Sequence, residues 1–227
     1  MATQNGSPVV TVRNTSAQQI ATEHSVTVPD YDRSRMEDVG FTTAMTLVLL
    51  GNYAQTGHFG GPLAYTPFNV AMHLGGAENG GLRYDYRRPK HPYSDRFMLA
   101  GGHNIPTSYA LWMIMGEAMS RKHAATADDR YAVDPNIAML SIDALGFRRG
   151  QGALDTLLAD NGLTDHPLFA QAKIRGIRAL AGHSETTDLT NDVNGGPSGL
   201  GVATAAGKAA FWDFVGADDS LKIMALE

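Results

Sequence analysis

NGGPSGLGVATAAGKAAFW, residues 194–212, combines five glycines and a proline with an alanine-rich run. The run predicts a helix from about Ser198 to Val215. The first turn of a helix carries unpaired N–H groups, and glycine allows an anion to approach them closely. The stretch therefore has two interpretations: a phosphate group bound at the start of the helix, or a helix of small residues that packs closely against a neighbouring element.

Short apolar runs alternate with helical patterns along the rest of the chain. Ser34 and Glu37 match a capping box and predict a long helix that ends near Gly51 or Gly57. Further helices are expected from residue 66 or 67 to 74, over 107–119, near 137–145 and 153–158, and over 172–182, and strands over 96–100 and 221–226. This alternation predicts the α/β class.

Composition limits the classes of function. The chain has 227 residues, a hydrophobic content of 43% and a net charge of −5, which argues against general binding to nucleic acids or anionic membranes. It has no cysteine, which excludes disulfides and thiolate chemistry and suits a reducing compartment. Residues 1–30 contain no apolar signal-peptide core, and the strongest apolar run, residues 44–50, is too short to span a bilayer. We expect a soluble, cytoplasmic protein.

Three histidines, His58, His103 and His183, each follow a glycine. A loop without bulky neighbours leaves an imidazole free to point into a pocket, where it can hydrogen-bond phosphate or hydroxyl groups. A distributed three-histidine metal site is the competing interpretation, although the spacings match no local zinc signature.

A basic and aromatic segment covers residues 81–97. Its cations, Arg83, Arg87, Arg88, Lys90, His91 and Arg96, suit either an anionic substrate or a solvated loop with ordinary ion pairs. Two prolines predict that the segment is mostly loop.

Four segments in a fixed order carry a family resemblance. They are TGHFGGPLAYTPFNVAMHL (56–74), DRFMLAGGHNIPTSYALWMIMG (95–116), LAGHSE (180–185) and NDVNGGPSGLGVATAAGKAA (191–210). They resemble the N-terminal part of the transketolase family, where Ser-Gly-His-Pro-Gly, Asp-Arg-Phe…Gly-His, Gly-His-Pro-Glu and Gly-Pro-Leu-Gly-x-Gly stretches occur in that order. The resemblance covers residues 35–116 and 172–227.

The resemblance implies a thiamine-diphosphate-binding fold, a mainly parallel sheet flanked by helices, with thiamine diphosphate and Mg²⁺ or Ca²⁺ as cofactors. Members transfer two-carbon ketol units between sugar phosphates. His103 would contact the cofactor, and His58 and His183 would face the substrate and assist proton transfer. The turn that contacts the cofactor would be Gly196, Pro197, Ser198 and Gly199.

The chain also departs from the family pattern. Phe59 and Ser184 stand where the family has proline, and Ser198 replaces a leucine. The interval between His103 and His183 is longer than usual, so residues of about 117–169 are interpreted as an insertion, which would reshape substrate access or extend a subunit interface.

The resemblance further implies the domain organisation. Residues 1–30 would be an N-terminal extension, and residues 31–227 the N-terminal part of a diphosphate-binding domain that is incomplete at the C-terminus. The metal ligands would lie beyond residue 227, and a pyrimidine-binding domain is missing. We therefore expect a fragment or one subunit of a split enzyme, in a homodimer or a heteromer with a chain that carries the pyrimidine-binding domain. Two alternatives remain: a 2-keto-acid dehydrogenase first component of pyruvate dehydrogenase type, with a keto-acid substrate, and a non-catalytic assembly relative.

Overall fold

The computed structural model describes residues 28–148, 175–217 and 219–226, together with residues 159, 160, 162 and 165. The expected extension, residues 1–30, therefore lies almost wholly outside the described residues. The chain is of the mixed α/β class, as predicted. The described elements are η2 (Arg33–Arg35), α2 (Met36–Ala54), α3 (Gly60–Leu74), η3 (Ala77–Asn79), β1 (Arg96–Leu99), η4 (Gly102–Asn104), α4 (Ile105–Thr126), η5 (Asp129–Tyr131), η6 (Ser141–Gly146), α7 (Leu200–Val215) and β2 (Ile223–Leu226).

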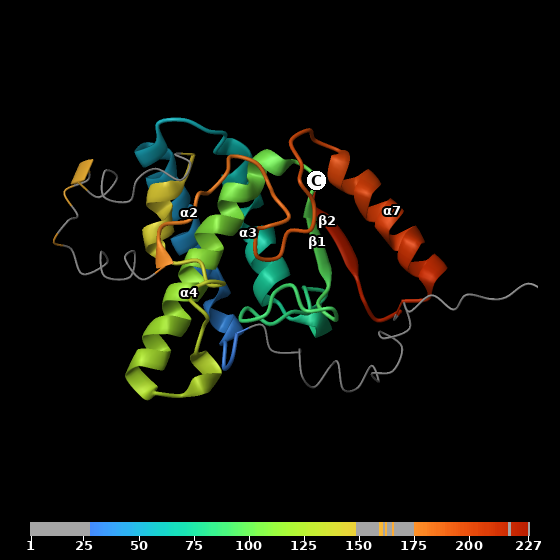
Figure 1. Ribbon diagram of the computed structural model, residues 1–227, viewed down its shortest axis with the longest axis horizontal. Helices are drawn as coiled ribbons and strands as arrows, with labels where there is room; N and C mark the ends of the chain where they lie inside the picture. Colours follow the sequence, from blue (N-terminus) through green and yellow to red (C-terminus); the bar gives the residue numbers. More distant parts are fainter. Residues whose placement is uncertain are drawn as a thin grey trace, which may run out of the picture.

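The two strands form a small parallel sheet. Arg96 of β1 lies opposite Ile223 of β2, and Leu99 opposite Leu226. The chain before α7 runs along the other edge of β1, where the Asp192 N–H donates to the Phe97 carbonyl at 2.8 Å. Figure 1 shows the strands between α7 on one side and α2, α3 and α4 on the other. Strand β1 is buried from Phe97 to Leu99, as its run of apolar residues indicates, whereas β2 is only partly buried, with Leu226 buried and Ala225 exposed.

Helix α4 forms the centre of the core. Most of its first three turns are buried, Tyr109 and Trp112 included, because α2 and α3 pack against the helix. The basic and aromatic segment contributes to this core, which corrects the prediction of a solvated loop. Tyr84 and Tyr86 are each 1% exposed, and the Tyr86 hydroxyl donates to the Trp112 carbonyl at 2.8 Å.

Several predicted boundaries were wrong. Ser34 does not cap α2; it lies in η2, where its N–H donates to the Asp32 carboxylate at 2.9 Å. Helix α3 starts at Gly60 rather than at residue 66 or 67, and it contains Pro67.

The insertion region also differs from the expectation. Helix α4 continues to Thr126, past the expected start at about 117. The helix expected near 137–145 is the 3-10 helix η6, and in the described part of 172–182 only Arg175 is helical, with Leu180 bridged to Phe147. The helix expected near 153–158 lies outside the described residues. None of the helices in the described parts of the chain is long and apolar enough to cross a membrane.

Candidate functional site

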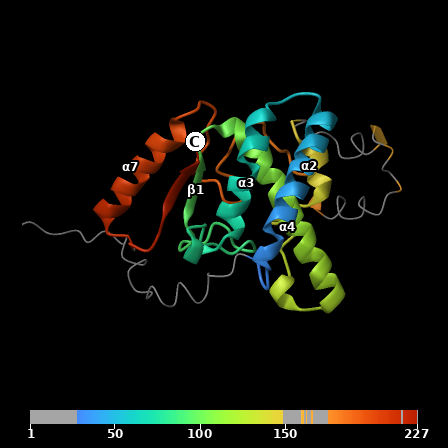
Figure 2. The ribbon, with the colours of Figure 1, turned by 180° about the vertical axis from the view of Figure 1, so that it is seen from behind.

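The candidate site lies where β1 and β2 reach their carboxyl ends. The N-terminal ends of α3, α4 and α7 lie at this same edge, at the top of Figures 1 and 2. None of the three helices has a side-chain hydrogen bond to its first turn. The edge therefore gathers helix N-terminal N–H groups and the positive ends of three helix dipoles, an arrangement that favours an anion.

The Gly-His segment after β1 meets two other predicted segments at this edge. A side chain on Gly102 would overlap with the carbonyl group of Gly195. The Ser184 N–H donates to the Gly102 carbonyl at 3.0 Å, and the Gly195 N–H donates to the Ser184 carbonyl at 3.1 Å. Three stretches that are far apart in the sequence are thus joined through their backbones, directly beside His103 and His183.

The start of α7 packs tightly on the end of β1. A side chain on Gly201 would overlap with the backbone of Ala100, so only glycine allows this approach. The close-packing interpretation is thereby confirmed for Gly201. Pro197, Ser198 and Gly199 are exposed, so the turn before the helix presents a face that the described structure leaves uncovered. Anion binding by this turn stays a prediction.

The three predicted histidines line this edge. The His58 and His103 rings meet edge to face, with centroids 5.4 Å apart and planes at 70°. His183 lies beside the glycine turn: its Cδ2 would be 3.7 Å from a Cβ placed on Gly196. His58 and His183 are exposed and His103 is half-buried, so all three imidazoles are accessible to a ligand. An imidazole in this setting can donate or accept a hydrogen bond and can carry a proton.

Asn104 is a site residue that the sequence did not indicate. Its side chain is 3% exposed, and its Oδ1 has no hydrogen-bond partner among the described residues. The amide lies between the start of α3 and the turn after β1, so close to Gly61 that a side chain there would overlap with Oδ1. A buried acceptor without a partner is costly, and it can be satisfied by a bound donor.

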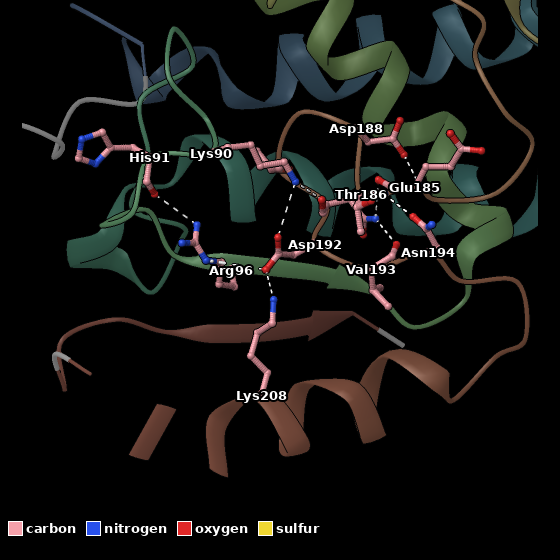
Figure 3. A network of polar contacts seen from close by, with 12 residues as sticks. Lys90, His91, Arg96, Glu185, Thr186, Asp188, Asp192, Val193, Asn194 and Lys208 are labelled. Carbon is pink, nitrogen blue, oxygen red and sulfur yellow. Dashed lines mark hydrogen bonds and ion pairs between the residues drawn. The ribbon is translucent and has the colours of Figure 1, made fainter. Parts of the chain in front are cut away.

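An ion-pair network anchors the loop that follows His183. Figure 3 shows Asp192 between Lys90, from the segment before β1, and Lys208, which reaches it from α7. Arg96 Nε also lies 3.8 Å from this carboxylate. Burial is the main cause that lowers the pKa of Lys90. These contacts hold the loop that follows His183 against β1 and position His183 beside the glycine turn.

Asp188 holds the same loop against α4. Its carboxylate accepts hydrogen bonds from the Glu185 N–H at 2.7 Å and from the Tyr109 hydroxyl at 3.2 Å. Burial disfavours the charged form and raises the pKa of Asp188 to about 6. Asp188 and Asp192 therefore have structural roles.

The geometry fits a diphosphate-bearing cofactor. The turn of Gly196, Pro197, Ser198 and Gly199 offers backbone without bulky side chains, His103 lies beside it, and it leads directly into the N-terminus of α7. Within the described parts of the chain, no three His, Asp or Glu side chains are grouped so as to hold a metal ion. The expected metal ligands were assigned beyond residue 227, and that expectation stays a prediction.

Comparison with known proteins assigns no family to the chain. No protein-family model matches it, and no curated protein matches it at a significant level.

Proposed function

We propose that the chain is the diphosphate-binding part of a thiamine-diphosphate-dependent enzyme of transketolase type, which transfers two-carbon ketol units between sugar phosphates. One observation carries the proposal. The segments around His58, His103 and His183 and the turn at 195–199, which suggested the family by their order, lie together at the carboxyl ends of parallel strands. Ligands of open α/β folds bind at this kind of edge.

The roles of the residues follow from their positions. The turn of Gly196, Pro197, Ser198 and Gly199 would bind the diphosphate through backbone N–H groups at the start of α7. His103, half-buried beside this turn, would orient the cofactor. When bound, thiamine diphosphate supplies carbanion stabilisation, which the side chains of this chain cannot provide. His58 and His183, both exposed, would bind substrate hydroxyls and move protons.

The proposal assigns some functions to residues outside this sequence. The metal ligands, and the glutamate that activates the cofactor in the family, would come from further sequence or from a partner chain with a pyrimidine-binding domain. The expected assembly is a homodimer or a heteromer of that kind.

A binding titration tests the proposal. Thiamine diphosphate is titrated calorimetrically, with Mg²⁺ present, into the full protein with any chain that co-purifies. We expect saturable binding that His103→Ala weakens. His123→Ala, at the far end of α4, is the matched control and should bind as the wild type does. Absence of binding to the wild-type protein would refute the proposal.

A second candidate, a 2-keto-acid dehydrogenase first component, rests on the departure from the transketolase pattern at Phe59. Phe59, where the family has proline, packs edge to face against Phe147 of the insertion, with ring centroids 6.2 Å apart. This contact places Phe147 against the loop of His58, where the proposed substrate would bind. Turnover of xylulose 5-phosphate with an aldose phosphate supports the first candidate, whereas turnover of pyruvate with an artificial electron acceptor supports the second.

A further inference from the structure

The insertion returns to the candidate site at Arg148. Phe147 is bridged to Leu180 in parallel, and the Arg148 N–H donates to the Leu180 carbonyl at 2.8 Å. Leu180 N–H in turn donates to the Gly146 carbonyl at 3.2 Å. Phe147 and Arg148 are therefore held against the segment that leads directly into Gly182 and His183.

The guanidinium of Arg148 lies between two histidine loops. Its Cζ is 2.9 Å from the place of a Cβ on Gly182, and its Nη1 is 3.5 Å from the place of a Cβ on Gly57. These glycines directly precede His183 and His58. Any side chain at position 182 would displace the guanidinium, so Gly182 leaves room for Arg148, whereas the distance from Nη1 to position 57 is that of an ordinary van der Waals contact.

Arg148 is not explained by an internal ion pair. Its side chain is exposed, and among the described residues no carboxylate lies within 4.0 Å of its guanidinium. Its backbone has φ of +56°, a left-handed conformation that is uncommon for a residue other than glycine. Such strained residues cluster at ligand-binding positions. A guanidinium offers a planar fork of donors that matches a phosphate or a carboxylate with two parallel hydrogen bonds.

We propose that Arg148 is a specificity-determining residue that binds the oxyanion of the substrate, a phosphate ester or a carboxylate, between the loops of His58 and His183. The inference rests on the proposed function for the chemistry of the site and adds to it the residue that recognises the charged end of the substrate. It also assigns a role to the insertion. The insertion supplies Arg148, a cation that the family motifs do not contain, beside the loops of His58 and His183.

The test compares the full protein with two variants. Arg148→Gln removes the charge and keeps most of the side-chain length, and Arg88→Gln is the matched control at an exposed arginine away from this edge. Xylulose 5-phosphate, unphosphorylated xylulose and pyruvate are titrated calorimetrically into each protein. Thiamine diphosphate is titrated separately, with Mg²⁺, so that cofactor affinity is known for each protein.

We expect Arg148→Gln to weaken binding of one anionic probe by about tenfold or more, the loss expected when a charge-assisted hydrogen bond is removed. Binding of xylulose and of thiamine diphosphate should remain within about twofold. Loss on xylulose 5-phosphate identifies a phosphate ester as the group bound, and loss on pyruvate identifies a carboxylate. Arg148→Lys should restore part of the affinity, because it keeps the charge without the fork.

The proposal is overturned if the wild-type protein binds neither anion, or if Arg148→Gln weakens them no more than Arg88→Gln does. Failure of the proposed function gives a different result. The wild-type protein then does not bind thiamine diphosphate, whereas the Arg148-dependent anion binding persists.

Discussion

The imidazole of His58 lies edge-on to the imidazole of His103, with ring centroids 5.4 Å apart, although one precedes α3 and the other precedes α4. The contact shows that two glycine-histidine loops, separate in the sequence, form one surface. The first turns of α3 and α4, which follow these loops, bring backbone N–H groups to the same edge. The following predictions test the parts of this arrangement.

The junction of Gly102 with Gly195 should tolerate no side chain. Gly102→Ala forces its methyl group against a backbone carbonyl, and we expect the free energy of unfolding to fall by about 1–3 kcal/mol, as for other overpacked sites. Urea denaturation measures the change. Gly40→Ala, within α2 and with no atom within 4 Å of the added methyl group, is the matched control and should stabilise by about 0.5–1 kcal/mol. Equal stability of Gly102→Ala and wild type would contradict the close junction.

His73 should make the protein less stable at low pH. The ring is fully buried; its Nδ1–H donates to the Asn69 carbonyl at 2.9 Å, and its Nε2 accepts from the Thr190 hydroxyl at 2.8 Å. Burial lowers the pKa of His73 from 6.5 to about 4, so the folded state favours the neutral ring. Its contribution is fully present above pH 6.5 and is lost as the pH falls toward 4. The shift corresponds to about 3 kcal/mol.

Replacement of His73 isolates its contribution to the pH dependence of stability. His73→Gln should lower stability at pH 7, because the buried contacts are imperfectly replaced, and it should remove the loss of stability between pH 6.5 and 4. Urea midpoints across this range provide the measurement. A variant whose stability changes with pH over this interval in the same way as that of the wild type would show that His73 is not the responsible group.

Asp188 should act in the opposite direction. Its pKa is raised from 3.8 to about 6 by burial, so the folded state favours the protonated carboxyl group. Its contribution to stability is fully present below pH 3.8 and is lost as the pH rises through 6. Asp188→Asn keeps an acceptor for the Glu185 N–H and removes the charge. We expect it to be more stable than the wild type at pH 7, by up to about 3 kcal/mol, with the difference vanishing below pH 4.

The two groups should partly cancel in the wild-type protein. Between pH 4 and 6, as the pH decreases, the contribution of His73 to stability falls and the contribution of Asp188 rises. The single variants should therefore have opposite pH slopes around a flatter wild-type curve. Parallel curves for the wild type and both variants would show that His73 and Asp188 do not cause these changes in stability.

The ion-pair network around Asp192 should hold the His183 loop in place. Asp192→Asn leaves Lys90, Arg96 and Lys208 close together without their shared counter-charge. We expect a loss of about 1–3 kcal/mol and faster amide hydrogen exchange over residues 183–195. Asp213→Asn, an acidic residue in the last turn of α7, is the control and should leave exchange in this loop unchanged. Unchanged exchange in Asp192→Asn would mean that other contacts position the loop.

The sequence predicted the elements whose formation depends on local pattern. The apolar runs at β1 and β2 and the small residues of α7 indicated the correct element types, and glycine before His58, His103 and His183 indicated loops that the structure brings to one edge. The start of α3 was missed because Gly60, Gly61 and Pro62 resemble a break, whereas glycine and proline are acceptable in a first turn.

The features that the sequence did not indicate depend on contacts between residues far apart in the chain. Tyr84 and Tyr86 stand among cations, and their burial depends on α4, which supplies Met115 and the Trp112 carbonyl as partners. Arg148 reaches the site only because its segment pairs with Leu180. No periodicity or local spacing encodes such a pairing. Arg148 and Asn104, whose Oδ1 has no partner among the described residues, could therefore not be predicted as site residues.

Ser198 provides the last test, because the transketolase family has leucine at this position. The side chain is exposed. In the proposed function the backbone of the turn, and not the hydroxyl of Ser198, contacts the cofactor. Ser198→Leu should therefore leave thiamine diphosphate affinity within about twofold of the wild type, since no hydrogen bond to the cofactor is removed. Gly199→Val is the contrasting variant: φ at this position is +86°, which a β-branched residue does not readily adopt, and the turn should distort. If Ser198→Leu abolished binding while Gly199→Val retained it, the backbone of the turn would not be the cofactor contact.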